Sequence, residues 1–137
     1  SKAGKGAQDY LKKQLNEETK KFDKEQAALK KQEKELIAKK KLISPEEYKK
    51  NLNDLRKKNI NFQKKRQKVA NDIFKKKEKA RLELNTALKP ILEKYMSDNN
   101  ISLVIDKKSI VVAKTEIDLT DKVLKILDQK LKSINLK

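Results

Sequence analysis

Apolar residues recur every seven positions along the first third of the chain. Leu15, Phe22, Leu29 and Leu36 form this repeat, and Leu11 precedes it, whereas Glu18, Glu25 and Gln32 occupy the intermediate positions. A seven-residue apolar repeat predicts a helix with a narrow apolar stripe of the coiled-coil kind. Because the intermediate positions are polar, we expect this helix to hold its partner only loosely.

A second repeat follows and predicts that partner. Tyr48, Leu55, Phe62 and Val69 lie seven apart, and Leu52 and Ile73 join them at the four-residue offset. Folding the two helices against each other brings Phe22 near Phe62 and Leu29 near Leu55. At about 1.5 Å per residue, a first helix of thirty-odd residues reaches roughly 50 to 55 Å, so the hairpin should protrude as an arm.

The stretch between the two repeats predicts the turn. In Leu42-Ile43-Ser44-Pro45-Glu46-Glu47-Tyr48, Ser44 can accept a hydrogen bond from the backbone N–H of Glu47, and Pro45 occupies the first helical position. Ile43 and Tyr48 form the apolar pair that fixes the entry of the chain into the helix. We therefore predict an αα-hairpin with its tip at 42–48. One helix start within an ordinary bundle is the alternative, although bundle helices are usually much shorter.

Beyond Ile73 the apolar residues lie on a different face of the helix, which predicts a different packing partner. Ala80, Leu84, Leu88, Ile91 and Tyr95 form a new face, and Pro90 within it predicts a kink rather than an end. Two β-branched runs then predict a β-hairpin over 101–113, followed by an amphipathic helix over 119–135. A lone two-stranded hairpin is marginal in water, so we expect other subunits to complete this body.

These elements predict an α+β fold with two parts. Residues 1–83 form a long helical hairpin arm, and residues 84–137 form a body made of the lower part of the second helix, the β-hairpin 101–113 and the C-terminal helix 119–135. The apolar residues expected to mediate oligomerisation are Ile101, Leu103, Val104, Ile105, Ile110, Val111 and Val112.

The charge of the chain is concentrated in the arm. The 137 residues include 37 Lys/Arg and 20 Asp/Glu, a net charge of +17, and residues 44–81 alone hold 14 cationic and 5 acidic side chains. Residues 82–137 hold 10 and 8. A basic arm implies an anionic partner, although a strongly charged surface also serves solubility.

The sequence contains no recognisable catalytic site. There is no cysteine and no histidine, and the two glycines form no phosphate-binding loop. We expect no enzyme activity, no metal site and no cofactor. Binding to a flexible chain suits the composition better, because lysines attract anionic segments without demanding a fixed geometry.

The residues predicted to bind such a chain lie on the second helix and at the tip. The basic set is Lys49, Lys50, Arg56, Lys57, Lys58, Lys64, Lys65, Arg66 and Lys68, and the apolar tip set is Ile37, Leu42, Ile43 and Tyr48. Nonspecific nucleic-acid binding is the main alternative, but only three cations are arginine and no aromatic stacking platform is present. A structural adaptor that uses the arm as a spacer is a third interpretation.

Three stretches carry a resemblance to a known family. AGKGAQDYLKK near the start, NNISLVIDKKSIVVA from Asn99 and DLTDKVLKILDQKLK from Asp118 together resemble the Skp/OmpH family of periplasmic chaperones. The likeness is strongest from Asn99 to Leu131. In this family a β-strand usually precedes the AGK segment, and an alanine is usual at the position of Gly6.

The resemblance implies a homotrimer in which strands from three subunits form the body and three arms enclose a cavity. It also implies an ATP-independent holdase that binds unfolded outer-membrane proteins in the periplasm. Anionic lipid or lipopolysaccharide is a further partner that the resemblance suggests, without residues that can be carried over. Sequence-specific nucleic-acid binding is not expected.

Overall fold

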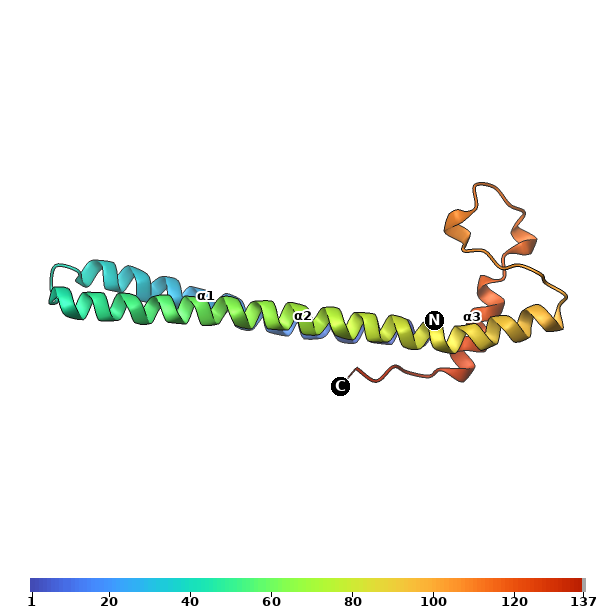
Figure 1. The fold of residues 1–137 in the computed structure, drawn as a ribbon, viewed down its shortest axis with the longest axis horizontal. Coiled ribbons are helices and arrows are strands. Elements are labelled where there is room, and N and C mark those ends of the chain that lie inside the picture. The colour runs from blue at the N-terminus through green and yellow to red at the C-terminus, as the bar shows by residue number, and fades with distance from the viewer. Residues whose placement is uncertain (137) are drawn as a thin grey trace. The chain divides into compact units, whose positions relative to one another are not determined.

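The computed structural model of the chain describes residues 1–136. Two long helices, α1 (Lys2–Lys39) and α2 (Pro45–Asp98), are followed by two short 3₁₀ helices, η1 (Lys107–Ser109) and η2 (Thr115–Ile117), and by α3 (Thr120–Lys130) (Figure 1). The chain divides into two compact units. Leu11–Lys75 form one unit, called the arm unit here, and Ser1–Tyr10 with the chain from Lys76 onward form the other, the base unit.

The arm unit is a helical hairpin over Leu11–Lys75, within the range 1–83 predicted for the arm. Its core consists of Leu29, Leu36, Leu55 and Phe62, with Phe22, Ile43, Tyr48 and Leu52 packed against them. The expected meeting of Phe22 with Phe62 is confirmed, since their ring centroids lie 5.9 Å apart in an edge-to-face arrangement at 83°. The seven-residue repeats therefore place the two helices correctly against each other.

The turn between the helices follows the predicted capping pattern. The Glu47 backbone N–H donates to Ser44 Oγ at 3.2 Å, and the Tyr48 N–H donates to the Ser44 carbonyl at 2.9 Å. The turn that follows α1 closes with a bond from the Leu42 N–H to the Lys39 carbonyl at 2.8 Å. Ser44 thus satisfies donors that would otherwise lack partners at the start of α2.

The base unit contains the first turns of α1, the second part of α2 and α3. Ser1 Oγ accepts the Gly4 N–H at 3.1 Å, and the Asp128 carboxylate of α3 accepts the Lys2 N–H at 2.7 Å. A carboxylate at a helix N-terminus is favourable because the first amide groups there carry partial positive charge. Gly4 lies so close to α2 that a Cβ there would be 3.2 Å from Leu84 Cδ1.

The second helix runs through Pro90 and ends in a Schellman motif. Asn100 adopts a left-handed conformation with φ 54°, the Ile101 N–H donates to the Met96 carbonyl at 2.9 Å, and the Asn100 N–H donates to the Ser97 carbonyl at 3.5 Å. Asparagine tolerates this conformation better than most residues. The helix therefore ends at Asp98, and Pro90 lies inside it without ending it, as expected.

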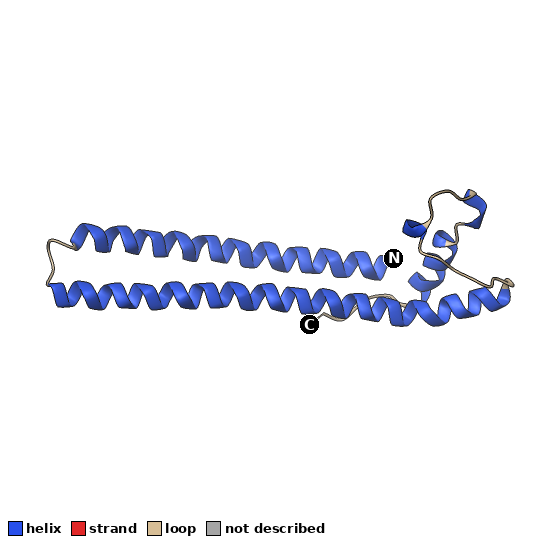
Figure 2. Cartoon of the chain, turned by 45° about the horizontal axis from the view of Figure 1, so that its top comes forward, coloured by secondary structure: helices blue, strands red, loops and turns tan. Residues whose placement is uncertain are grey.

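The predicted α+β class is wrong. Residues 1–136 contain no β-strand (Figure 2), and the segment from Asn99 to Leu119 contains turns, η1 and η2 where the β-hairpin 101–113 was expected. Between the two β-branched runs, Asp106 Oδ1 accepts the Lys108 N–H at 2.9 Å and caps η1. No ladder of backbone hydrogen bonds joins the runs in this part of the chain.

The physical reason is that β propensity describes a fit to neighbouring strands rather than a backbone preference. Val111 and Val112 have the composition of a strand, yet they are 98% and 88% exposed and meet no neighbour on which to pack. Two short runs without a third strand or a covering helix do not stabilise a sheet. The chain alone is therefore all-α in its described residues.

Without a sheet between them, α3 packs directly on α2. Ile91, Val123 and Leu127 form the core of this contact, and Leu84, Leu88, Leu119, Leu124 and Leu131 surround it. Leu84, Leu88 and Ile91 of the predicted apolar face are the residues that α3 covers. The helix expected over 119–135 is shorter in the structure, where α3 ends at Lys130. Its last hydrogen bond, from the Leu131 N–H to the Leu127 carbonyl at 2.7 Å, precedes an extended segment.

Candidate functional site

The basic surface of α2 divides into free and engaged cations. Six of the nine predicted client-binding cations are exposed and have no ion-pair or hydrogen-bond partner among the described residues: Lys49, Lys50, Arg56, Lys57, Lys64 and Lys68. Their charge is therefore directed to solvent. A surface of this kind raises the local concentration of anionic ligands and steers their approach.

The other three predicted cations lie beside the seam with α1. Lys58 Nζ donates to Gln32 Oε1 at 2.9 Å, Lys65 Nζ pairs with Glu25 Oε1 at 2.9 Å, and the Arg66 guanidinium lies 5.8 Å from the Phe62 ring centroid. Gln32 and Glu25 are the polar seam positions seen in the sequence. Lys58 and Lys65 therefore join the two helices, whereas Arg66 contacts a ring of its own helix, and all three are less available for an external ligand than the free six.

The four predicted tip residues do not share one environment. Ile37 and Leu42 are 60% and 81% exposed, whereas Ile43 and Tyr48 pack against the arm core. Lys40 Nζ also lies 5.8 Å from the centroid of the Tyr48 ring. Only Ile37 and Leu42 therefore offer apolar surface at the tip.

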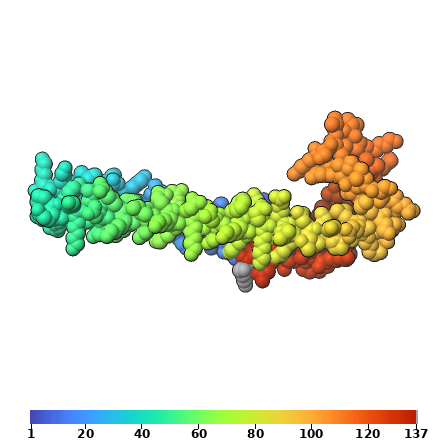
Figure 3. All heavy atoms as spheres, viewed as in Figure 1, coloured from blue at the N-terminus to red at the C-terminus, as the bar shows by residue number. Residues whose placement is uncertain are grey.

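The segment predicted to mediate oligomerisation is almost entirely exposed in the single chain. Leu103, Ile105, Val111 and Val112 are 70%, 53%, 98% and 88% exposed, and Val104 and Ile110 lie just above one third. Ile101 is half-buried. In the space-filling view this segment, in orange, stands clear of most of the base unit (Figure 3). The two β-branched runs therefore present most of their apolar side chains to solvent in the single chain.

A polar contact closes the loop that carries Val111 and Val112. Lys107 Nζ pairs with Asp118 Oδ2, while Asp118 Oδ1 accepts the Thr120 N–H at 3.0 Å and the Thr120 hydroxyl at 2.6 Å. The hydrogen bond from Lys107, followed by those from Thr120, holds the pKa of the Asp118 carboxyl well below its usual range. Asp118 thus caps the start of α3 and ties it to η1.

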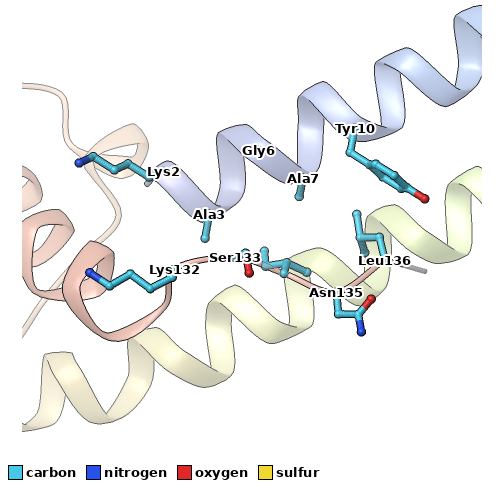
Figure 4. Close-up of a pocket in the computed structure, with 10 residues that line it drawn as sticks. Lys2, Ala3, Gly6, Ala7, Tyr10, Lys132, Ser133, Asn135 and Leu136 are labelled. Atoms are coloured by element: carbon cyan, nitrogen blue, oxygen red, sulfur yellow. The ribbon is translucent and has the colours of Figure 1, made fainter.

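A shallow groove in the base unit was not foreseen from the sequence. Ala3, Gly6, Ala7 and Tyr10 of α1 line one side, and the extended segment from Lys132 to Leu136 lines the other, around a volume of about 270 Å³ (Figure 4). Leu136 is only 4% exposed. A Cβ added to Gly6 would meet no atom within 4 Å. The surface of the groove is mostly apolar, although Lys2, Ser133 and Asn135 also line it.

Two exposed apolar residues of the arm unit were also missed. Ile60 is 54% exposed and Phe74 is 64% exposed on α2. The available signal was the alternating three- and four-residue spacing that places both on one side of the helix with Lys57 and Lys64. The seven-residue repeats do not indicate this surface, because neither Ile60 nor Phe74 belongs to them.

The described residues contain no group of three or more His, Cys, Asp or Glu side chains able to hold a metal ion. Over the same residues, no helix combines the length and apolarity that a membrane crossing requires.

Comparisons with known proteins bear on both sequence and fold. A family model described as Outer membrane protein (OmpH-like) matches residues 1–127. A crystal structure of a putative outer membrane chaperone (OmpH-like) from Caulobacter crescentus CB15 superposes with a TM-score of 0.87 at 24% identity, covering 98% of this chain and 80% of that one. No curated protein matches.

The structural likeness, at this identity, concerns the fold. The family match covers nearly the whole sequence, from the first turn of α1 to Leu127 in α3, and it agrees with the resemblance seen in the three sequence stretches. The chain therefore belongs to the OmpH-like family of outer membrane proteins.

Proposed function

We propose that this chain is an ATP-independent holdase that binds unfolded outer-membrane proteins in the periplasm and prevents their aggregation. The observation that carries the proposal is the surface of α2, where six unpaired cations lie beside exposed apolar side chains in a chain of the OmpH-like family. Such a surface attracts an unfolded chain electrostatically and then offers weak apolar contacts.

The proposal includes a homo-oligomer, specifically a trimer. The exposed apolar residues from Leu103 to Val112 support an interface between copies, because a monomer seldom exposes so much contiguous apolar surface. Several arms acting together would sum many weak contacts, so that avidity replaces tight binding at any one site.

The test is a competition assay without ATP at near-physiological salt. A fluorescent, urea-denatured outer-membrane β-barrel is diluted into the protein, and excess duplex DNA is then added. The barrel should stay soluble and bound, and DNA should displace little of it. Aggregation of the barrel together with tight DNA binding would contradict the proposal and favour a nonspecific nucleic-acid-binding protein.

The electrostatic part has its own test. Replacing Lys50, Lys57, Lys64 and Lys68 by glutamine should weaken barrel binding about tenfold at low salt and by less at high salt, since ions screen exposed charges. The matched control makes the same change in net charge at Lys122, Lys125, Lys130 and Lys132 in and after α3. Equal losses in the two variants would show that only the net charge matters.

A further inference from the structure

One side of α2 in the arm unit forms a continuous surface that the helical hairpin does not use. Its residues follow one another at intervals of three or four, and we call them the outer face of α2: Lys50, Asn53, Lys57, Ile60, Lys64, Gln67, Asn71 and Phe74. At about 100° per residue they lie opposite the seam residues Leu55, Phe62 and Val69. All eight side chains are exposed, and none is acidic.

The composition of the outer face is not explained by the stability of the arm. Ile60 and Phe74 are 54% and 64% exposed and belong to no apolar cluster of the described residues. Lys50, Lys57 and Lys64 have no ion-pair partner in the described part of the chain, and the Gln67 amide bonds only to Asn71 of the same face, at 3.1 Å. Ile60 lies between Lys57 and Lys64, and Phe74 lies at the end of the same face. Exposed apolar side chains that share one face with unpaired lysines indicate a ligand with both apolar and anionic groups.

The spacing of the two apolar side chains limits the conformation of that ligand. Ile60 and Phe74 are fourteen residues apart, which is about 21 Å along a helix. An extended chain advances about 3.3 Å per residue, so about six of its residues span this distance. Because six is even, the two ligand residues that meet Ile60 and Phe74 lie on the same side of the extended segment.

A second helix fits this face poorly. Even the loose seam between α1 and α2 has an apolar residue of α1 in every heptad, whereas the outer face has two apolar residues over about three and a half heptads. A second copy of the basic arm is also disfavoured, because it would bring lysines against lysines. An extended acidic segment needs no apolar residue in every heptad, and it brings carboxylates rather than lysines against the outer face.

We propose that the outer face of α2 binds an extended, acidic polypeptide segment that carries apolar side chains six positions apart on one of its sides. The proposal rests on the proposed function, since it names the part of an unfolded client that the arm recognises. Strands of membrane β-barrels alternate apolar and polar residues over about ten positions, so they contain such segments. The flexible lysine stems reach client carboxylates without requiring a fixed position for them.

The first experiment uses three synthetic peptides of about ten residues and the full chain labelled with nitrogen-15. One peptide has two leucines six positions apart among several glutamates, the second has the leucines five apart, and the third has glutamine in place of glutamate. The first should bind at least about fivefold more tightly than the others and shift amide signals between residues 50 and 74. Equal binding of all three, or shifts confined to other parts of the chain, overturns the proposal.

The second experiment separates this proposal from the function on which it rests. The double variant Ile60→Ser with Phe74→Ser should bind a denatured β-barrel about tenfold or more weakly, because two apolar contacts are lost. Leu82→Ser is the matched control, since Leu82 is 67% exposed on the same helix but lies outside the outer face. It should change binding by less than about twofold.

The outcomes are distinguishable. If the unaltered chain holds the barrel and the double variant holds it equally well, the outer face is not the binding surface and the holdase function stands. If the unaltered chain does not keep the barrel soluble, the proposed function and this inference fall together. Far-ultraviolet circular dichroism checks that the variants keep their helices, as expected for exposed positions.

Discussion

Replacing Phe62 by alanine tests whether the seam of the arm unit stabilises it. Phe62 is 2% exposed and packs with Leu29, Leu36 and Leu55, and its ring meets Phe22 edge to face. Phenylalanine-to-alanine changes in cores cost about 3 to 5 kcal/mol, of which an aromatic pair accounts for about 0.5 to 1.5 kcal/mol. Because Phe22 remains half-buried and the seam is narrow, we expect about 3 kcal/mol, at the lower end of this range.

Trypsin reports this loss directly, since the arm is rich in lysine. When the arm opens and closes faster than trypsin cleaves, the cleavage rate follows the equilibrium population of the open form. A loss of about 3 kcal/mol should therefore raise the rate of cleavage within the arm about a hundredfold. Urea unfolding followed by circular dichroism, at one protein concentration for all variants, gives the same free energy by a second route.

Phe74→Ala is the matched control for this stability measurement. It removes the same side chain from the same helix, but Phe74 is 64% exposed, so the cost should stay within about 0.5 kcal/mol. Similar losses in the two variants would refute the reasoning, because burial at the seam would then not distinguish them. A loss below about 1 kcal/mol for Phe62→Ala would show that the arm is held by other contacts.

Three further predictions concern single positions. Ser44→Ala removes the acceptor of the Glu47 N–H and should cost about 1 kcal/mol in urea unfolding, whereas Ser44→Asp should retain most of the stability. Gly6→Ala should stabilise the chain by about 0.5 to 1 kcal/mol, because a Cβ there meets no atom; unchanged or lower stability would contradict the open groove. The depressed pKa of Asp118 means that its stabilising contacts are fully present above the unfolded value of about 4 and are lost as pH falls through the lower folded value. Carboxyl NMR should find the pKa of Asp118 well below its ordinary value of 3.8 and find it raised in Lys107→Ala, and an ordinary value in the unaltered chain would contradict this contact.

The helical hairpin could be predicted because its signals are local and repeated. The seven-residue spacing of Leu29 and Leu36 identifies the buried side of α1, and the Ser44-Pro45 pair identifies the start of α2. Both depend on neighbours in sequence and on one partner helix of matching period. The contact of Phe22 with Phe62 also follows from the sequence, because residues at similar distances from the turn face each other in a hairpin.

The body could not be predicted in the same way, because strand formation depends on partners that composition does not supply. Val111 and Val112 have the residue type of a strand but no strand beside them, and the Asp106 side chain favours a 3₁₀ turn between the runs.

The exposed pair Ile60 and Phe74 could not be predicted for a different reason. Isolated apolar residues on a charged helix are ordinary in sequence, and only their shared exposure on one side distinguishes them.

The ion pair across the seam helps to determine the register in which the two helices of the arm unit pack. A strict seven-residue repeat does not distinguish registers that differ by one heptad, since an apolar residue meets an apolar residue again after each step. The ion pair of Glu25 with Lys65 removes part of this degeneracy, because a slide in one direction places Glu25 opposite Asp72. A slide in the other direction would move the apex of the turn back toward Lys41 and Leu42 and leave Pro45 inside a segment that must then be straight. The arm can therefore tolerate a weak apolar seam and still close in a single register, because charge sign and the turn, rather than packing strength, exclude the misaligned forms.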